Sequence, residues 1–223
     1  MTTTLTDLQK RIHDYEKTYH RTAHSVRLLA VSKAQSIEKI ASLYQQGQRA
    51  FGENYLQEAL LKIPALPTDI EWHFIGTLQR NKTRRVAENF AWVQSVTSIE
   101  LAKRLNEQRP SHLLPLNICI EINLQQEHSK SGVYLNDVET LMNYCATRSN
   151  LKLRGIMAIP QPQSSFTAQC AVFHELHTLY QSLQMQGFAL DTLSMGMSDD
   201  FEAAIAEGTT LIRIGRALFG ERV

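Results

Sequence analysis

The chain has 223 residues, of which 43% are hydrophobic and 20% charged, with ten glycines and six prolines. This composition excludes a disordered, collagen-like or low-complexity protein and provides enough apolar residues for a sizeable core. The 23 Lys and Arg residues nearly balance the 22 Asp and Glu residues, so a net charge of +1 gives no strong overall field toward nucleic acid or an anionic membrane.

Cysteine usage and the N-terminal segment narrow the class of protein. The three cysteines, at positions 119, 145 and 170, are too few and too far apart for a disulfide framework or a zinc site. The segment MTTTLTDLQKRIHDY lacks the apolar core and cleavage site of a signal peptide. No apolar run approaches the roughly 20 residues needed to cross a bilayer. We therefore expect a cytoplasmic protein that binds neither a membrane nor a metal.

The first predicted elements are a helix and a short strand. Apolar residues recur at spacings of three and four over 5–19, which indicates an amphipathic helix. Thr6 and Gln9 could form a capping box at its start. The apolar run 28–31 is too short for a helix and is followed by polar residues, which is typical of a buried strand.

The same pair of signals then repeats along the chain. A helical stripe over 37–44 stops at Gly47, a residue type that commonly ends helices. Further strand-like runs are found at 49–51, 71–75, 91–96, 116–122, 153–159, 192–197 and 210–214. Between them, one helix is expected to begin near Thr97 and another near Asn136 or Asp137. A third is expected to end at Gly187, and a fourth to run from near Asp199 to Gly208.

Eight strand candidates, each flanked by a helix, predict parallel βαβ units. In this length they fit a single (β/α)8 barrel over residues 1–223, with an extra helix before the first strand. An open, doubly wound sheet is the alternative. The barrel is favoured because little chain follows Gly215, so the extra N-terminal helix could cover the gap after the last strand.

Lys33 follows the first strand directly, at the strand end where barrels carry functional side chains. It could be an ordinary surface lysine just past the core. It could also be an amine nucleophile, which partial burial and neighbouring cations would activate. Arg213 and Arg216 would be such neighbours if the first and last strands adjoin.

Arg213 shares one face of the last strand with Leu211 and Gly215, and one face of each strand lines the barrel. An inward arginine keeps its proton and needs a buried acceptor. That acceptor could be an acid such as Glu121, or a ligand atom.

Small and polar residues after the last two strands suggest a phosphate site. Ser198 could donate a hydroxyl hydrogen bond, Gly215 would allow close approach to the backbone, and Arg216 would add a charge-assisted bond. Alternatively, Ser198 is an ordinary helix cap. The acidic pair at 199 and 200 counts against an anion there.

Three other features have ordinary structural explanations. His73 lies inside a predicted strand and is expected to be a hydrogen-bonded core histidine. The histidines in His174-Glu175-Leu176-His177 are three residues apart rather than four, so a zinc-protease helix is not expected. The basic cluster over 80–85 is expected to be a solvated helix rather than an RNA site.

Seven short motifs together resemble one known family, that of the pyridoxal phosphate homeostasis proteins. They occur in order over nearly the whole chain: LLAVSK at 28–33, FGEN at 51–54, WHFIG at 72–76, LQRNK at 78–82, HSKSG at 128–132, LSMGMS at 193–198, and RIG at 213–215 with LFG at 218–220.

The resemblance implies a single alanine-racemase-like barrel that binds pyridoxal 5′-phosphate. It implies that Lys33 forms a Schiff base with this cofactor and that Arg213 faces the pyridine nitrogen. The other residues it implies at the cofactor are Ser198, Gly215 and Arg216 at the phosphate, and Asn54, Lys130 and Met195 along the pocket. Two positions depart from the family pattern: Arg216 replaces a small hydroxyl residue, and Thr77 replaces a residue that is often His or Pro.

The family is regarded as regulating cofactor supply and amino-acid balance without established turnover. The resemblance therefore implies a monomeric cofactor carrier, with pyridoxal-phosphate-dependent apo-enzymes as recipients and no catalytic residues. An amino-acid racemase is the alternative, but we expect no second base opposite Lys33. A third reading is a barrel enzyme that uses Lys33 on a phosphorylated carbonyl substrate.

Overall fold

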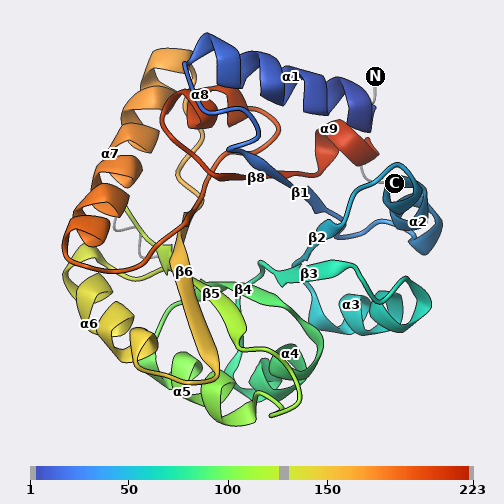
Figure 1. Ribbon diagram of the computed structural model, residues 1–223, viewed down its shortest axis with the longest axis vertical. Helices are drawn as coiled ribbons and strands as arrows, with labels where there is room; N and C mark the ends of the chain where they lie inside the picture. Colours follow the sequence, from blue (N-terminus) through green and yellow to red (C-terminus); the bar gives the residue numbers. More distant parts are fainter. Residues whose placement is uncertain (1–3, 126–130, 221–223) are drawn as a thin grey trace.

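Eight parallel strands close into one barrel, in which the spatial order of the strands follows the sequence (Figure 1). The computed structural model describes residues 4–125 and 131–220. The strands are β1 (Arg27–Val31), β2 (Ala50–Glu53), β3 (Glu71–Phe74), β4 (Trp92–Val96), β5 (Leu116–Ile122), β6 (Leu151–Ala158), β7 (Thr192–Ser194) and β8 (Leu211–Ile214).

Helices surround the barrel on its outside. After α1 (Leu5–Thr18), which precedes β1, they are α2 (Ile37–Gln45), α3 (Leu56–Lys62), α4 (Thr83–Asn89), α5 (Ile99–Gln108), α6 (Leu135–Ala146), α7 (Phe166–Met185), α8 (Phe201–Ala206) and α9 (Arg216–Phe219), with short 3-10 helices η1 (Ile63–Ala65) and η2 (Arg80–Lys82). Within the described residues, no helix has the length and apolar character needed to cross a membrane.

The pairing of β1 with β8 closes the barrel. The two strands run parallel, with Leu29 opposite Arg213 and Ala30 opposite Ile214. This pairing confirms the predicted (β/α)8 barrel and excludes the open sheet. It also places the end of β1, which Lys33 follows, beside the end of β8, which carries Arg213 and precedes Arg216.

Residues of each strand alternate between two cores, because successive side chains point to opposite faces. The outer core, between strands and helices, contains most of the buried hydrophobic residues. Two small clusters fill parts of the interior: Leu29, Ala50, Ile75 and Leu211 in one, and Trp92, Cys119 and Met157 in the other. Polar side chains occupy further interior positions, and they define the site described below.

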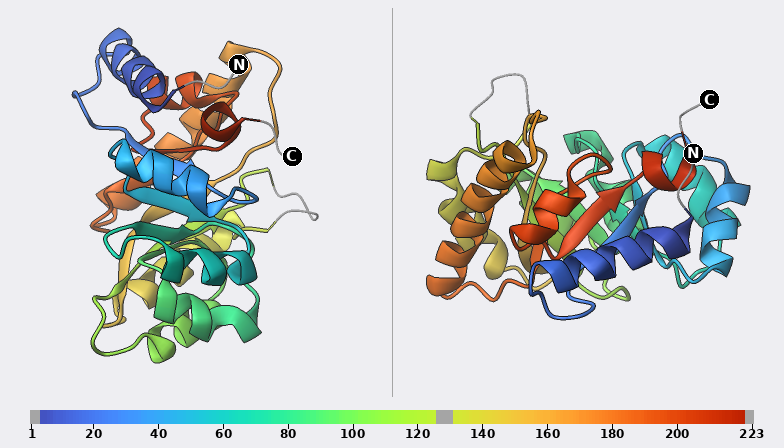
Figure 2. Two further views of the ribbon diagram at one scale, coloured as in Figure 1. Left: turned by 90° about the vertical axis from the view of Figure 1, so that its right-hand side faces the viewer. Right: turned by 90° about the horizontal axis from the view of Figure 1, so that it is seen from above.

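The N-terminal helix α1 packs beside α8, as the two views of Figure 2 show. The ring of Tyr15 meets that of Phe201 edge-on at 5.6 Å between centroids, and the hydroxyl of Tyr19 donates to Glu202 over 3.0 Å. The guanidinium of Arg21, just after the helix, donates to the carbonyls of Ile205 and Thr209. The predicted role of this helix as a cover for the last strands is therefore confirmed.

The sequence predicted the helices themselves better than the residues that cap them. The first helix is capped by Thr4, whose hydroxyl accepts from the backbone N–H of Asp7, so the predicted capping box at Thr6 and Gln9 is wrong. The helix predicted to start at Thr97 is instead capped by Ser98. Ser, Thr and Asp compete for the same capping role, and one residue of offset is enough to change the cap.

Strand β7 is shorter than its apolar run. It ends at Ser194, three residues before the predicted end, because Gly196 adopts a φ of +94°. A Cβ at this glycine would lie 2.5 Å from the Cβ of Ala204, so the position also requires close approach to α8. The chain consequently leaves the barrel early and forms a loop over the ends of β7 and β8.

Candidate functional site

A cavity of about 550 Å³ opens at the carboxyl ends of the strands. This volume lies within the range of about 300–1,000 Å³ that small-molecule sites usually have. The side chains and backbone around it come from the ends of β1, β2 and β8 and from the loop after β7. The structure brings together here six residues predicted from the sequence: Lys33, Asn54, Ser198, Arg213, Gly215 and Arg216.

The turn that carries Lys33 is held on both sides of the lysine. On one side, the buried hydroxyl of Ser32 donates to Oε1 of Glu53 over 2.6 Å. On the other side, Ala34 adopts a left-handed conformation with a φ of +59°, and its N–H donates to Oε1 of Glu58 over 2.7 Å. This conformation is unfavourable for alanine, and the hydrogen bond that Ala34 donates to Glu58 stabilises it. The bond thereby helps to fix the direction in which Lys33 leaves the strand.

A buried lysine joins the two carboxylates behind this turn. Nζ of Lys62 lies 2.8 Å from Glu53, 2.7 Å from the carbonyl of Ser32, and also contacts Glu58. The Lys62 side chain is only 5% exposed. Burial raises the pKa of Glu53, although the hydrogen bonds from Lys62 and Ser32 oppose that shift. We call Glu53, Glu58 and Lys62 the support cluster.

Sequence reasoning did not identify the support cluster. Glu58 and Lys62 are four residues apart on α3, a spacing that usually signals an exposed helix pair. The packing of α3 against the end of β2, rather than any local pattern, buries Lys62 and leaves Glu58 partly exposed.

Arg213 is held in a fixed orientation at the inner end of the cavity. Its Nη1 donates to the carbonyl and to the hydroxyl of Ser194, each over 2.8 Å, and its Nη2 donates to the carbonyl of Ala158 over 2.9 Å. Burial lowers the pKa of Arg213 to about 10, which leaves the group charged at neutral pH. Among the described residues these bonds use three of the five N–H groups of a guanidinium, so two remain for a ligand.

No hydrogen bond or ion pair joins Glu121 to Arg213 among the described residues, so the structural pair considered from the sequence is present only as an electrostatic attraction, which opposes the lowering of the pKa of Arg213. The described contacts of Glu121 instead include the hydroxyl of Ser131, which donates to Oε1 over 3.2 Å. The carboxylate is buried, its Oε2 has no hydrogen bond from a described residue, and burial raises its pKa. Carbonyl and hydroxyl oxygens of β6 and β7 accept from three of the five N–H groups of the inward arginine.

The predicted phosphate residues meet at the rim of the cavity. The hydroxyl of Ser198 accepts from the backbone N–H of Ala217 at 3.4 Å, beside Gly215 and Arg216. Asp200, not Ser198, precedes α8 at the capping position, so Ser198 is not the ordinary helix cap of the alternative reading. Arg216 lies 3.2 Å from the carboxylate of Asp199, which partly confirms the concern about acidic neighbours.

The other predicted residues have different outcomes. Asn54 lines the cavity, and its Oδ1 is buried without a hydrogen bond among the described residues. Met195 does not line the cavity, because it is fully buried in the outer core. Successive side chains alternate between the two faces, so Met195 points outward where Ser194 points inward. Lys130 lies outside the described residues.

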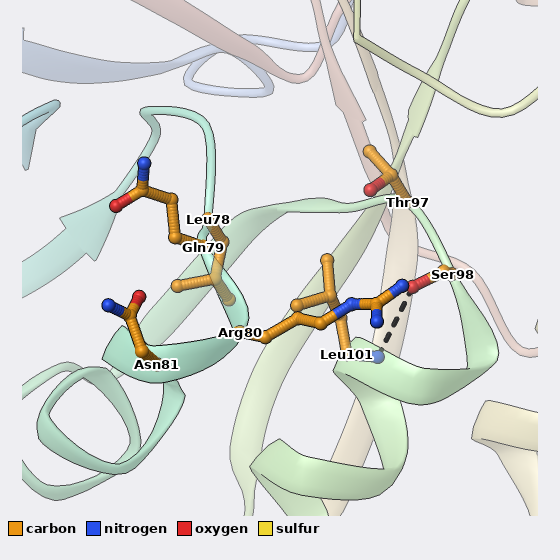
Figure 3. Close-up of a pocket in the computed structure, with 7 residues that line it drawn as sticks. All are labelled: Leu78, Gln79, Arg80, Asn81, Thr97, Ser98 and Leu101. Carbon is orange, nitrogen blue, oxygen red and sulfur yellow. Dashed lines mark hydrogen bonds between the residues drawn. The ribbon is translucent and has the colours of Figure 1, made fainter.

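A second, more open pocket lies beside this site, between the segments that follow β3 and β4 (Figure 3). Ser98 accepts from the backbone N–H of Leu101 over 3.2 Å, and Arg80 pairs with Glu100 over 2.9 Å. Gln79 and Asn81 point away from Arg80 in the close-up. Because its polar groups bond to each other or face away, this pocket offers no convergent set of ligand contacts.

The main cavity can therefore recognise a ligand with three kinds of group. The amine of Lys33 can attack a carbonyl carbon. The guanidinium of Arg213 can donate to a ring or carboxylate acceptor, and the rim at Ser198 and Arg216 can donate to an anion. The sites for these three groups surround one cavity.

Comparisons with known proteins show which proteins this chain resembles. The profile of the family described as "Alanine racemase, N-terminal domain" matches residues 6–223. The pyridoxal phosphate homeostasis protein of Haemophilus influenzae is 46% identical over 220 residues, covering 96% of this chain and 93% of that protein. The protein of the same name from Escherichia coli is 47% identical over 206 residues, covering 91% of this chain and 88% of that protein.

Solved structures give the same answer for the fold. PipY of Synechococcus elongatus, determined with pyridoxal phosphate bound, is 35% identical, with a TM-score of 0.81 and coverage of 94% of this chain and 100% of PipY. Alanine racemase of Corynebacterium glutamicum is 17% identical, with a TM-score of 0.68 and coverage of 97% of this chain and 61% of the racemase. The second likeness concerns the fold alone.

Proposed function

Because the chain belongs to the family of pyridoxal phosphate homeostasis proteins, we propose that it binds pyridoxal 5′-phosphate covalently through Lys33 and regulates the supply of this cofactor. The observation that carries the proposal is the cavity where Lys33, Arg213 and Ser198 meet. These residues match the aldehyde, the ring nitrogen and the phosphate of the cofactor. PipY, a similar protein determined with pyridoxal phosphate bound, supports the choice of this cofactor.

The polar atoms of the cavity fit this cofactor. The buried Oδ1 of Asn54 lacks a partner among the described residues, which a bound ligand would provide. Arg213 has N–H groups to donate to a ring nitrogen that has no proton, and Arg216 with Ser198 can donate to phosphate oxygens. Lys130 and Met195 remain predicted contacts of the cofactor, although Met195 would need to act from behind the cavity wall.

Each residue then has one task in binding. The support cluster and Ala34 direct Lys33 toward the cavity, where its amine would be placed to condense with the aldehyde of the cofactor and release water. Ser194 and Ala158 hold Arg213 so that it donates toward the ring. When bound, the cofactor supplies an aldehyde that captures amines and a ring that can accept electrons.

Arg213 also favours binding over turnover. An arginine has no acceptor, and a pKa of about 10 keeps it charged, so the ring nitrogen facing it stays unprotonated. An unprotonated ring withdraws electrons less strongly, which disfavours carbanion chemistry. We therefore propose that the protein acts as a carrier and that pyridoxal-phosphate-dependent apo-enzymes receive the cofactor. Its monomeric state, its cytoplasmic location and its single domain over residues 1–223 stay predictions.

Borohydride reduction of the cofactor-loaded protein, followed by peptide mapping, tests the proposal. We expect one adduct, on Lys33, and no absorbance shift on adding the cofactor to Lys33→Ala. Lys39→Ala is a matched control, because this lysine is exposed on α2 and bonds to Gln35. An adduct found mainly on Lys130 or Lys82 would overturn the assignment.

Racemisation is the second candidate function, favoured by the fold shared with alanine racemase. It requires two bases, one on each face of the substrate carbon, within about 3 Å of the proton that each moves. Incubation of the loaded protein with L-alanine, followed by chiral chromatography, decides between the two. Turnover on the order of 1 s⁻¹ that Lys33→Ala abolishes would establish an enzyme.

A further inference from the structure

A continuous chain of hydrogen bonds crosses the inside of the barrel, from Arg213 beside the cavity to Glu71 at the opposite end. Nη1 of Arg213 donates to Oγ of Ser194 over 2.8 Å, and this hydroxyl donates to Oε1 of Gln94 over 2.7 Å. Nε2 of Gln94 lies 2.9 Å from Nδ1 of His73, and Nε2 of His73 lies 2.9 Å from Oε1 of Glu71. The chain thus joins β8, β7, β4 and β3.

Hydrogen-bond chemistry gives this chain one direction. Arg213 can only donate, so Ser194 accepts from it and points its single hydroxyl hydrogen at the amide oxygen of Gln94. The NH₂ group of Gln94 is then left to donate to Nδ1 of His73. A histidine that accepts at Nδ1 carries its proton on Nε2, and this proton is donated to the carboxylate of Glu71. Every donor in the chain points away from the cavity.

The members between the two ends are shielded from water. Ser194, Gln94 and His73 are each 0% exposed. The ring of His73 also stacks on that of Trp92, with centroids 4.9 Å apart and planes within 8°. Burial lowers the pKa of His73, which favours the neutral ring that the chain requires. Reversing any one bond would leave a buried polar group without a partner, so the orientation of each member depends on its neighbour.

We propose that Gln94, oriented by His73, is a positioning residue for Arg213. By accepting the Ser194 hydrogen, Gln94 makes that hydroxyl present a lone pair to Nη1. This fixes the guanidinium so that its remaining donors meet the ring nitrogen of the bound cofactor. The inference rests on the proposed function, because it concerns how Arg213 recognises pyridoxal phosphate.

Loss of Gln94 should therefore weaken one contact of the ligand. With leucine at this position, the Ser194 hydroxyl has no acceptor for its hydrogen, so it can leave the rotamer in which it accepts from Nη1. Arg213 then keeps only the carbonyls of Ser194 and Ala158, and its angle to the ring is fixed by two hydrogen bonds instead of three. A merely structural role would lower stability without changing which ring atom the site recognises.

The test compares pyridoxal phosphate with an analogue in which the ring nitrogen is replaced by CH. We expect the wild-type chain to prefer the true cofactor by at least about tenfold, the size of one charge-assisted hydrogen bond, and Gln94→Leu to reduce this preference about fivefold. Gln48→Leu is the matched control. Gln48 is also a buried glutamine, bonded to the carbonyls of Leu28 and Ala50, and it does not contact Arg213. Its substitution should leave the preference unchanged.

His73→Phe provides a second variant that keeps a ring against Trp92 but removes the acceptor for Gln94. It should reduce the preference in the same direction, and it decides the question if Gln94→Leu does not fold. An unchanged preference in a folded variant overturns the inference. So does a wild-type chain that binds both ligands equally, because Arg213 would then not face the ring nitrogen. A wild-type chain that binds neither ligand shows instead that the proposed function has failed.

Discussion

At the residue scale, Arg216 and Asp199 face each other across the rim of the cavity. The side chains are 65% and 73% exposed, and their charged atoms are 3.2 Å apart. A phosphate bound beside Ser198 and Gly215 has to compete with this carboxylate for the guanidinium. Exposed ion pairs contribute about 0–1 kcal/mol, so an anion with several oxygens can displace one.

This competition predicts opposite effects for the two residues. Arg216→Ala should weaken binding of pyridoxal phosphate by about 1 kcal/mol, because exposure reduces the usual strength of a charge-assisted bond. Asp199→Asn should strengthen it, and neither change should affect unphosphorylated pyridoxal. Fluorescence titration with both ligands measures the difference, with Arg84→Ala, at an exposed position of α4, as the control. Equal losses for both ligands would place the phosphate elsewhere.

The sequence could identify the residues that line the cavity, but not the ones that support them. Lys33, Arg213 and Ser198 stand at strand ends, where the barrel architecture itself indicates function. Glu53 also ends a strand, but Lys62 and Glu58 lie on α3 and lack such a signal, because their contact with Glu53 depends on how α3 packs against the end of β2. The same limit explains Gln94, which meets Ser194 a hundred residues later in the chain.

At the scale of elements, the turn after β1 depends on α3. Lys62 is the only described cation bonded to Glu53, and both side chains are almost fully buried. Removing one partner of a buried ion pair leaves the other charge without compensation. The support cluster is therefore where a single substitution should affect both the fold and the direction of Lys33.

Lys62→Met should lower the free energy of unfolding by about 3–5 kcal/mol at neutral pH, as for other broken buried pairs. It should also slow the reaction of Lys33 with pyridoxal phosphate. The double variant Glu53→Gln with Lys62→Met should recover part of the stability, because the one unpaired carboxylate left, that of Glu58, is partly exposed. Urea denaturation measures these changes, and Lys39→Met on α2 serves as the control. A loss below about 0.5 kcal/mol, typical of surface sites, would contradict the role of the cluster.

Strands were predictable to within three residues at each end, and the largest error is at the end of β7. Apolar runs identify β1 to β8, because both faces of a strand in this barrel meet a core. The end of β7 depends on the positive φ of Gly196, which hydrophobicity does not reveal. Capping residues at Thr4 and Ser98 were similarly misplaced, because several neighbouring residues could have served.

At the scale of the whole molecule, the hydrogen-bond chain spans the barrel and ends on Glu71. Burial alone would raise the pKa of Glu71, but hydrogen bonds from His73 and Arg27 outweigh it and lower the pKa to about 2. The unfolded chain has the ordinary value of 4.5. A carboxyl group whose pKa is lower in the folded state stabilises the fold above its unfolded pKa and loses that effect as the pH falls.

We therefore expect the free energy of unfolding to fall between about pH 4.5 and pH 2, and Glu71→Gln to reduce this dependence. The contribution should be about 1 kcal/mol after screening, since the Glu71 side chain is 34% exposed. Denaturation of both proteins across this pH range measures it. Glu107→Gln is the control, because that carboxylate is well exposed on α5. Parallel curves for wild type and Glu71→Gln would show that the acid sensitivity arises elsewhere.

Arg213 stabilises the barrel as well as lining the cavity, since its hydrogen bonds link β8 to Ser194 on β7 and to Ala158 on β6. A lysine would present its donors from a single point and could not span those two strands. Selection for a stable fold would thus retain this arginine in a descendant that no longer met any ligand. For tracing ancestry within this group of barrels, persistence of the arginine therefore records only that the barrel has been kept.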